Sequence, residues 1–240
     1  MKILAVETSA GPASCAVWED GKILAQSYIN NSLTHSQTLM PMIETMLTHT
    51  QTTLNDVDYV AVSVGPGSFT GIRIGVAAVK GLAFAKNIPC IPVSTLAAIA
   101  QNAAGIPYNG IVCAAMDARC NQVYTACFLS ENGTLSRLTD DEAIPLEELK
   151  IRLISYKKMI FCVGDGAKLC YNYCKESVPE LFLASAHLQY QNATGVAVQA
   201  AQQAQSGAVT THETLQPFYL RLPQAERELK QKQQLLKNGG

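Results

Sequence analysis

Charge, aromatic side chains and long apolar runs are all scarce in this sequence. Only 15% of its 240 residues are charged, 7% are aromatic, and the formal net charge is −1. A nearly neutral chain has no overall electrostatic attraction to nucleic acid or to an anionic membrane. No window reaches the roughly 18 apolar residues of a membrane span, because Lys80 interrupts the best one. With 48% hydrophobic residues the chain is globular, and long enough for one large or two small domains.

Signatures of metal sites and disulfide frameworks are missing too. The eight cysteines form no Cys-x-x-Cys pair, and Cys15, Cys90, Cys113 and Cys162 lie in apolar strand-like runs, where free cysteine acts as a small hydrophobe. The four histidines are scattered, without metal-ligand spacing. The apolar segment before Glu7 is too short for a secretory signal peptide. We therefore expect a reduced, cytoplasmic protein without a metal site.

Motifs of common catalytic centres are also absent. The chain contains no Gly-x-Ser-x-Gly elbow and no Walker A loop. Asp117 and Arg119, at the end of a predicted strand, are the remaining candidates for chemistry, but an aspartate that caps a turn beside an arginine is the commoner case. We predict no catalytic residue and no cofactor.

What the sequence does contain is a glycine turn between a strand and a helix. The run 59–75 opens with β-favouring apolar residues, turns at 65–67, and enters a helix capped by Ser68 or Thr70. Backbone N–H groups at such a helix start can hold an anion. The hydroxyl-rich loop after the first strand is a second such place, although an ordinary β-turn is the alternative. The candidate phosphate loop consists of Thr8, Ser9, Gly65, Gly67 and Ser68.

The helix that follows, 68–86, has little polar surface. Arg73 and Lys80 lie on one side of it, so it must bury more than one face. Gly71 and Gly75 are one turn apart and would allow another backbone to approach closely. We interpret this face as the contact with a partner helix; packing on the chain's own sheet is the alternative. The first interpretation predicts that Gly75→Glu abolishes partner binding and leaves the fold intact, and the second predicts unfolding.

An earlier helix, 36–50, also has surplus apolar surface. Met40 and Met42 lie off its main stripe and give it a second, adaptable face. Two successive helices of this kind indicate a surface that docks on a partner helix pair. The main stripe is formed by Leu39, Ile43, Met46 and Leu47.

The order of predicted elements indicates an α/β fold with two similar βββαβα-type lobes. Three short strands, at 3–7, 13–19 and 22–29 with a tight Asp20-Gly21 turn between the last two, open the chain, and helices and strands then alternate. Turn-forming residues cluster at 105–110, after which the pattern recurs. Strands are predicted at 111–116, 122–128 and near 135, followed by a helix at 146–155, a strand at 159–163 and a helix at 168–176. The alanine-rich helix 193–205 is a candidate to pack back on the first lobe. We predict lobes at 1–105 and 106–222 and a polar tail at 223–240.

Several motifs occur together over nearly the whole chain. They are the run 65–75, Glu7-Thr8-Ser9, His35-Ser36-Gln37 with Leu39 and Pro41, Ile91-Pro92-Val93-Ser94-Thr95-Leu96, Asp117-Ala118-Arg119 with Val123-Tyr124, and Pro217-Phe218-Tyr219-Leu220-Arg221. In this combination the chain resembles the bacterial TsaB family, formerly called YeaZ. Glu7 stands where that family more often has aspartate.

The resemblance implies an actin-like ATPase (ASKHA) fold and a role in making threonylcarbamoyladenosine (t6A) beside the tRNA anticodon. It implies a non-catalytic partner of the transferase TsaD, bound through the helices 36–50 and 68–86, with TsaE as a third component and tRNA as the substrate of the complex. Because an exposed apolar helix face is commonly covered by a twofold homodimer, we also expect self-association when the partner is absent.

The catalytic relative TsaD shares the glycine turn, so the two must be told apart. TsaD carries two metal-binding histidines, four residues apart, where this chain has Thr95 and Ile99. Since isoleucine cannot ligate a metal, the resemblance favours a scaffold over an enzyme. The alternative is an actin-like ATPase or phosphotransferase that acts on a small substrate and binds a nucleotide through the Thr8-Ser9 and Gly164-Asp165-Gly166 loops. The expected partner-contact residues are Leu39, Met42, Ile43, Met46, Phe69, Thr70, Gly71, Ile72, Arg73, Gly75, Val76, Val79 and Lys80.

Overall fold

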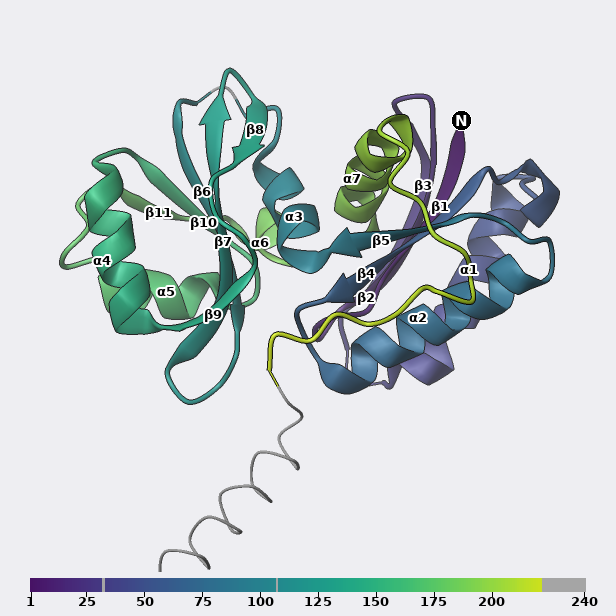
Figure 1. The fold of residues 1–240 in the computed structure, drawn as a ribbon, viewed down its shortest axis with the longest axis horizontal. Helices are drawn as coiled ribbons and strands as arrows, with labels where there is room; N and C mark the ends of the chain where they lie inside the picture. The colour runs from purple at the N-terminus through teal and green to yellow at the C-terminus, as the bar shows by residue number, and fades with distance from the viewer. Residues whose placement is uncertain (32, 107, 222–240) are drawn as a thin grey trace, which may run out of the picture.

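The computed structural model describes residues 1–31, 33–106 and 108–221, which form two α/β lobes side by side (Figure 1). The first lobe contains β1 (Lys2–Glu7), β2 (Ala13–Glu19), β3 (Lys22–Ile29), α1 (His35–His49), β4 (Tyr59–Gly65), α2 (Phe69–Phe84) and β5 (Cys90–Ser94). The predicted lobe end at 222 and the tail 223–240 lie outside the described residues.

A short helical segment leads to the second lobe. It consists of α3 (Thr95–Ala100) and the 3₁₀ turn η2 (Gln101–Ala103). The second lobe contains β6 (Gly110–Asp117), β7 (Gln122–Glu131), β8 (Thr134–Arg137), β9 (Glu142–Pro145), α4 (Leu146–Tyr156), β10 (Ile160–Val163), α5 (Ala167–Cys174), β11 (Leu181–Leu183) and α6 (Ala186–Gln189), and α7 (Ala193–Gln205) follows.

Both lobes have the same sheet topology, which confirms the predicted α/β duplication. The strand order is β3-β2-β1-β4-β5 in the first sheet and β8-β7-β6-β10-β11 in the second, where β9 also pairs with β7. The first three strands of each sheet are antiparallel, and the next two join in parallel. The parallel pairs follow from the strand–helix–strand order, since a helix provides the crossover.

Helices cover both faces of the first sheet. Leu4 and Val6 point into the core under α1 and α2, whereas Ile3 and Ala5 point into the core under α7. A strand that is buried on both faces has no polar side, so β1 is a continuous apolar run. Helix α7 follows the second lobe in the chain but packs on β1 and β2 of the first (Figure 1).

Neither a membrane helix nor a disulfide is found in the part of the chain described above. Its helices lack the combination of length and apolar character that a lipid bilayer requires. All eight cysteines are free thiols, and Cys120 is the exposed one.

Gly71 and Gly75 face the first lobe itself. A Cβ at Gly71 would lie 2.1 Å from the carbonyl oxygen of Thr8, and a Cβ at Gly75 would lie 2.4 Å from Thr8 Oγ1 and 3.3 Å from the Val62 side chain. The Thr8 hydroxyl also donates a hydrogen bond of 2.8 Å to the Gly71 carbonyl. The expectation that these glycines face a partner helix is therefore wrong. The close approach is made by the chain's own β1–β2 loop.

This packing predicts opposite effects for two glycine substitutions in one helix. Gly71→Ala should lower the free energy of unfolding by about 1–3 kcal/mol, because the Thr8 backbone cannot rotate away from the new methyl group. Gly81→Ala is the control, since nothing lies within 4 Å of its Cβ position; it should be neutral or stabilise the helix by up to about 1 kcal/mol. Urea unfolding measures both, and equal effects would contradict the packing.

Candidate functional site

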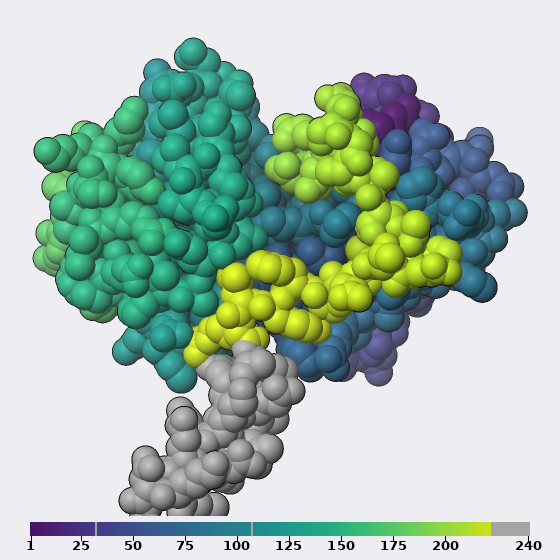
Figure 2. Space-filling view, viewed as in Figure 1, coloured from purple at the N-terminus to yellow at the C-terminus, as the bar shows by residue number. Residues whose placement is uncertain are grey.

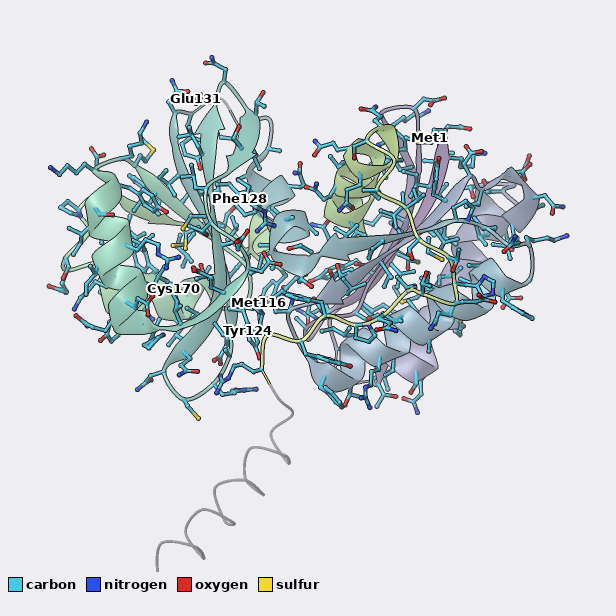
Figure 3. All side chains as sticks on the ribbon, viewed as in Figure 1. Met1, Met116, Tyr124, Phe128, Glu131 and Cys170 are labelled. Atoms are coloured by element: carbon cyan, nitrogen blue, oxygen red, sulfur yellow. The ribbon has the colours of Figure 1, made fainter. Side chains whose placement is uncertain are left out.

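A cavity of about 510 Å³ lies between the two lobes. Its walls come from the β1–β2 loop, the β4–α2 turn, the β6–β7 loop, the β10–α5 loop and residues 218–221. Met116 and Tyr124 lie on the second-lobe side (Figure 3). We call this cavity the cleft. It contains most of the candidate phosphate loop, because the carboxyl ends of β1 and β4 meet at this edge of the first sheet.

The structure brings the predicted phosphate-loop residues together, but they bind one another. Ser68 N donates a hydrogen bond of 2.7 Å to the Ser9 carbonyl, and Gly71 N donates one of 3.2 Å to Ser68 Oγ. A Cβ at Gly67 would lie 2.4 Å from the same Ser9 carbonyl oxygen. The expectation of an N–H group open to an anion is thus wrong for Ser68, since the β1–β2 loop accepts its hydrogen bond, and the N–H of Gly71 is occupied by the cap of its own helix.

Glu7 forms the floor of this region and is fully buried. Its carboxyl group accepts hydrogen bonds from Ser9 N, at 2.6 Å, and from Ser63 Oγ. Burial raises the pKa of Glu7, and the nearby Asp165 carboxyl raises it further. A buried carboxyl group whose two oxygens already have partners is poorly suited to bind a magnesium ion.

Two other carboxylates lie at the cleft. Burial raises the pKa of Asp165, which accepts a hydrogen bond of 2.7 Å from Gln191 Nε2. Asp117 accepts a hydrogen bond of 2.7 Å from Arg119 N and pairs with the exposed Arg119 guanidinium at 3.5 Å. Asp117 and Arg119 therefore cap a turn. No group of three or more potential metal ligands occurs within residues 1–31, 33–106 and 108–221.

The two positions that we expect to distinguish this chain from TsaD lie in α3. Thr95 and Ile99 are both fully buried. Ile99 belongs to the core cluster that α3 shares with the second lobe.

Residues 208–221, the C-terminal strap, run from α7 along α2 to the cleft (Figures 1 and 2). Thr210 and Cys90 exchange two backbone hydrogen bonds of 2.8 Å. Farther along, Phe218 N donates a hydrogen bond of 2.7 Å to the Val64 carbonyl. Arg221 then reaches the second lobe, where its guanidinium donates a hydrogen bond of 2.7 Å to the Ala118 carbonyl. The strap therefore joins the two lobes at the cleft.

The strap also covers one side of α2. Arg73 donates a hydrogen bond of 2.9 Å to the Tyr219 hydroxyl, and its guanidinium carbon lies 3.8 Å from the centroid of the Phe69 ring. The Phe69 and Tyr219 rings are 4.9 Å apart, and Lys80 Nζ donates to the Glu213 carbonyl at 3.3 Å. This contact is not among the predictions made from the sequence. The feature of the sequence that could have indicated it is the aromatic pair Phe218-Tyr219, which lies close to Arg221 in an otherwise polar segment.

Most of the expected partner-contact residues are buried within the first lobe. They pack between the first sheet and the helices α1 and α2, because the apolar stripe of a helix is buried against the sheet of its own lobe. Their assignment to an exposed contact surface is therefore wrong. These residues are Leu39, Met42, Ile43, Met46, Gly71, Ile72, Gly75, Val76 and Val79.

The outer surface of α1 and α2 remains exposed, and we call it the docking face. The two helices lie side by side over one face of the first sheet (Figure 1). Phe84 is 73% exposed and Met40 is 45% exposed. Of the expected contact residues, Thr70 and Arg73 are exposed here, whereas Phe69 and Lys80 are half-buried. The docking face consists of Met40, Pro41, Glu44, Thr45, Thr70, Arg73, Ala77, Gly81 and Phe84.

Comparison with known proteins shows to which family this chain is related. Residues 22–229 match the family described as TsaD, tRNA N6-adenosine threonylcarbamoyltransferase. The tRNA threonylcarbamoyladenosine biosynthesis protein TsaB of Escherichia coli K12 is 33% identical over 222 residues, which cover 92% of this chain and 95% of that protein. The chain belongs to the TsaB family. The resemblance drawn from the motifs is thus confirmed.

Solved structures support the fold of this TsaB-family chain. YeaZ from Pseudomonas aeruginosa has a TM-score of 0.77 at 30% identity, covering 91% of this chain and 99% of that one. Component A of (R)-2-hydroxyglutaryl-CoA dehydratase from Acidaminococcus fermentans has a TM-score of 0.50 at 13% identity, covering 85% of this chain and 99% of that one. The second likeness concerns the fold alone. The predicted actin-like fold is confirmed.

The burial of Glu7 predicts a specific pH dependence. Because burial raises its pKa above the ordinary 4.5, the folded state keeps a proton that the unfolded state releases. The free energy of unfolding should therefore fall as pH rises from 4.5 through the folded pKa. Glu7→Gln mimics the protonated group and should remove this fall, so the variant gains stability relative to the wild type as pH rises.

Urea unfolding at a series of pH values measures this difference. Glu131→Gln, at an exposed carboxylate, is the control and should follow the wild type. Parallel curves for Glu7→Gln and the wild type would mean that Glu7 is ionised in the folded chain.

Proposed function

We propose that this chain is a non-catalytic subunit of the machinery that makes t6A in tRNA. It binds the catalytic subunit TsaD through the docking face and supports threonylcarbamoyl transfer to a tRNA adenosine. TsaE completes the complex, and tRNA is the substrate of the whole assembly. The names of the relatives support the pathway, since the Escherichia coli protein is named for tRNA threonylcarbamoyladenosine biosynthesis and the matching family for the transferase.

The observation that carries the binding role is the composition of the docking face. Its only charged residues in the described structure are Glu44 and Arg73, and Arg73 is already bound to the strap. Ala77 and Gly81 are small and exposed on α2, so another helix can approach closely there. Phe84, at the end of α2, supplies a large apolar contact, the type of residue that dominates interfaces.

The contacts in the cleft support a non-catalytic role. The Thr8 hydroxyl, the Ser9 backbone and the Ser68 backbone and hydroxyl hydrogen-bond within the first lobe, and both oxygens of Glu7 accept bonds from neighbouring residues. The Ser9 hydroxyl alone among these groups is buried without a hydrogen-bond partner. An ATPase or phosphotransferase would need such groups to bind phosphate or magnesium. This is the argument against the alternative function.

Ala77→Glu tests the docking face directly. Glutamate should remain solvated in the isolated chain, because Ala77 is exposed, but in the complex it would add bulk and an unpaired charge to the interface. We expect TsaD binding to weaken by at least about 30-fold, the size of an interface hot spot. Isothermal titration calorimetry measures the affinity, and circular dichroism checks the fold.

Gln202→Glu, at an exposed position of α7, is the matched control and should bind TsaD normally. The same face should form the homodimer of the isolated chain, so Ala77→Glu should sediment as a monomer and TsaD should convert the wild-type dimer to a heterodimer. Normal TsaD binding by a folded Ala77→Glu variant would refute the proposed interface.

The non-catalytic role has its own test. The purified chain should give no threonylcarbamoyl transfer to tRNA, because the TsaD histidine positions are occupied by Thr95 and Ile99. Transfer should appear when TsaD and TsaE are added. Activity of this chain alone would show that it is an enzyme, and stoichiometric iron or zinc in it by elemental analysis would contradict the expected absence of a metal site.

A further inference from the structure

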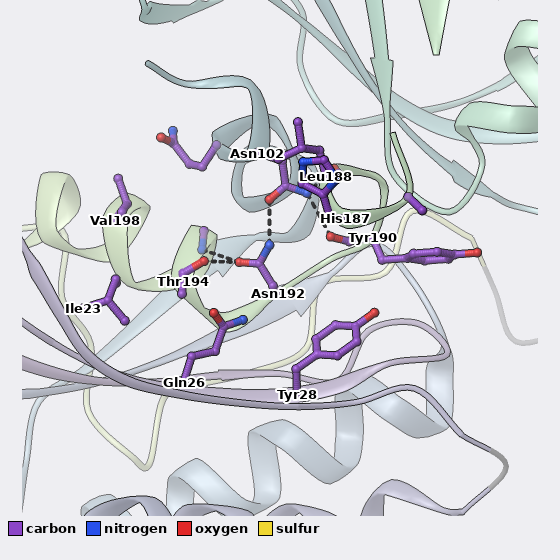
Figure 4. A pocket seen from close by; sticks show the side chains of 13 residues that line it. Ile23, Gln26, Tyr28, Asn102, His187, Leu188, Tyr190, Asn192, Thr194 and Val198 are labelled. Atoms are coloured by element: carbon purple, nitrogen blue, oxygen red, sulfur yellow. Dashed lines mark hydrogen bonds between the residues drawn. The ribbon is translucent and has the colours of Figure 1, made fainter. Parts of the chain in front are cut away.

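A second cavity, of about 660 Å³, lies beside α7, between β3 of the first lobe and α6 of the second (Figure 4). Its walls come from β3, η2, α6 and the first turns of α7, and none of its lining residues lines the cleft. The volume falls within the roughly 300–1,000 Å³ typical of small-molecule sites. We call it the α7 pocket.

One wall of the α7 pocket is held rigid by a network of amides. Asn102 Nδ2 donates to the carbonyl oxygens of Leu188 and Tyr190 at 2.8 and 2.9 Å, and Asn102 Oδ1 accepts from Asn192 Nδ2 at 2.8 Å. Asn192 also caps α7, because its Oδ1 accepts from Gly195 N at 2.9 Å. Figure 4 shows these bonds. They fix the backbone around Tyr190, so this wall is already formed without a ligand.

The opposite wall is the edge strand β3. Val17 and Trp18 are adjacent in β2 but pair with Ala25 and Ile23, so β3 contains one extra residue, a β-bulge. Bulges redirect side chains and are common beside functional sites. Through this bulge Ile23 lines the same pocket as Gln26 and Tyr28. Gln26 and Tyr28 rise from β3 toward α7, and Tyr190 lies across from Tyr28 (Figure 4).

The types of residue that line the α7 pocket indicate the kind of ligand that it can bind. None of the described residues around the pocket is aspartate, glutamate, lysine or arginine, and His187 is the one lining residue that can become a cation. A phosphate would therefore lose its hydration with no ionic partner other than His187, whose Nδ1 already lies 3.2 Å from Ser185 Oγ. Tyrosine rings offer flat faces on which an unstacked base can lie, and a glutamine amide can both donate to and accept from the edge of a base. Ile23, Leu188 and Val198 add apolar contact.

We propose that the α7 pocket binds an uncharged nucleoside, with its base against Tyr28 and Tyr190 and its edge toward Gln26. This site is independent of the proposed docking function, because neither α1 nor α2 contributes a residue to it. Its failure would leave the docking proposal intact.

Adenosine binding to the full chain, followed by NMR chemical-shift titration, tests this proposal. We expect saturable binding with shifts from pocket residues, and AMP should bind no more tightly than adenosine. Tyr28→Ala should weaken adenosine binding by about 5- to 150-fold, as expected for the loss of base stacking. Tyr28→Phe keeps the ring and should retain most of the affinity, and Gln26→Ala should reduce it.

Tyr173→Ala is the matched control, since Tyr173 is 44% exposed, close to the 42% of Tyr28, but lies on α5. It should leave adenosine binding unchanged. Three results would overturn the proposal: no saturable binding up to the solubility limit of adenosine, equal affinity in Tyr28→Ala and the wild type, or tighter binding of AMP with shifts from cleft residues. Thermal melting of each variant separates lost binding from lost folding.

Discussion

The contact between Thr8 and the first two turns of α2 determines much of the first lobe. Gly71 and Gly75 lack a side chain where the β1–β2 loop passes, and the Thr8 hydroxyl donates to the Gly71 carbonyl at 2.8 Å. The same approach brings the Ser9 carbonyl to Ser68 N at 2.7 Å. Two glycines inside a helix cost about 1 kcal/mol each in helix propensity. Close packing of backbone on backbone offsets that cost, which explains their positions.

This contact has consequences on both sides of α2. Toward the cleft, the β1–β2 loop packs into the β4–α2 turn, and Glu7 is buried beneath it. Away from the cleft, the buried glycine face fixes which residues point outward, so Ala77 and Gly81 form the exposed stripe. The features that weaken a catalytic role and those that support docking therefore have one cause.

Local sequence patterns predicted most of the fold. Apolar runs and the Asp20-Gly21 turn gave β1, β2 and β3 within one residue, and capping residues gave the ends of α2 within two. The strands β9 and β11 were not predicted, because a strand of three or four residues is too short to show the alternation of apolar and polar side chains. Periodicity also shows that one face of a helix consists of apolar or small residues, but it does not show which neighbouring element covers that face. That is why the glycine face was assigned to a partner, and why the strap, a contact between distant segments, was not foreseen.

Oxidative footprinting of methionine tests the docking face most directly. Met40 lies on that face and is 45% exposed, whereas Met159, in the second lobe, is 38% exposed and serves as an internal reference. We predict that adding TsaD slows the oxidation of Met40 and leaves the rate at Met159 unchanged, as measured by mass spectrometry. Equal oxidation of Met40 in the free chain and in a saturated TsaD complex would contradict the account.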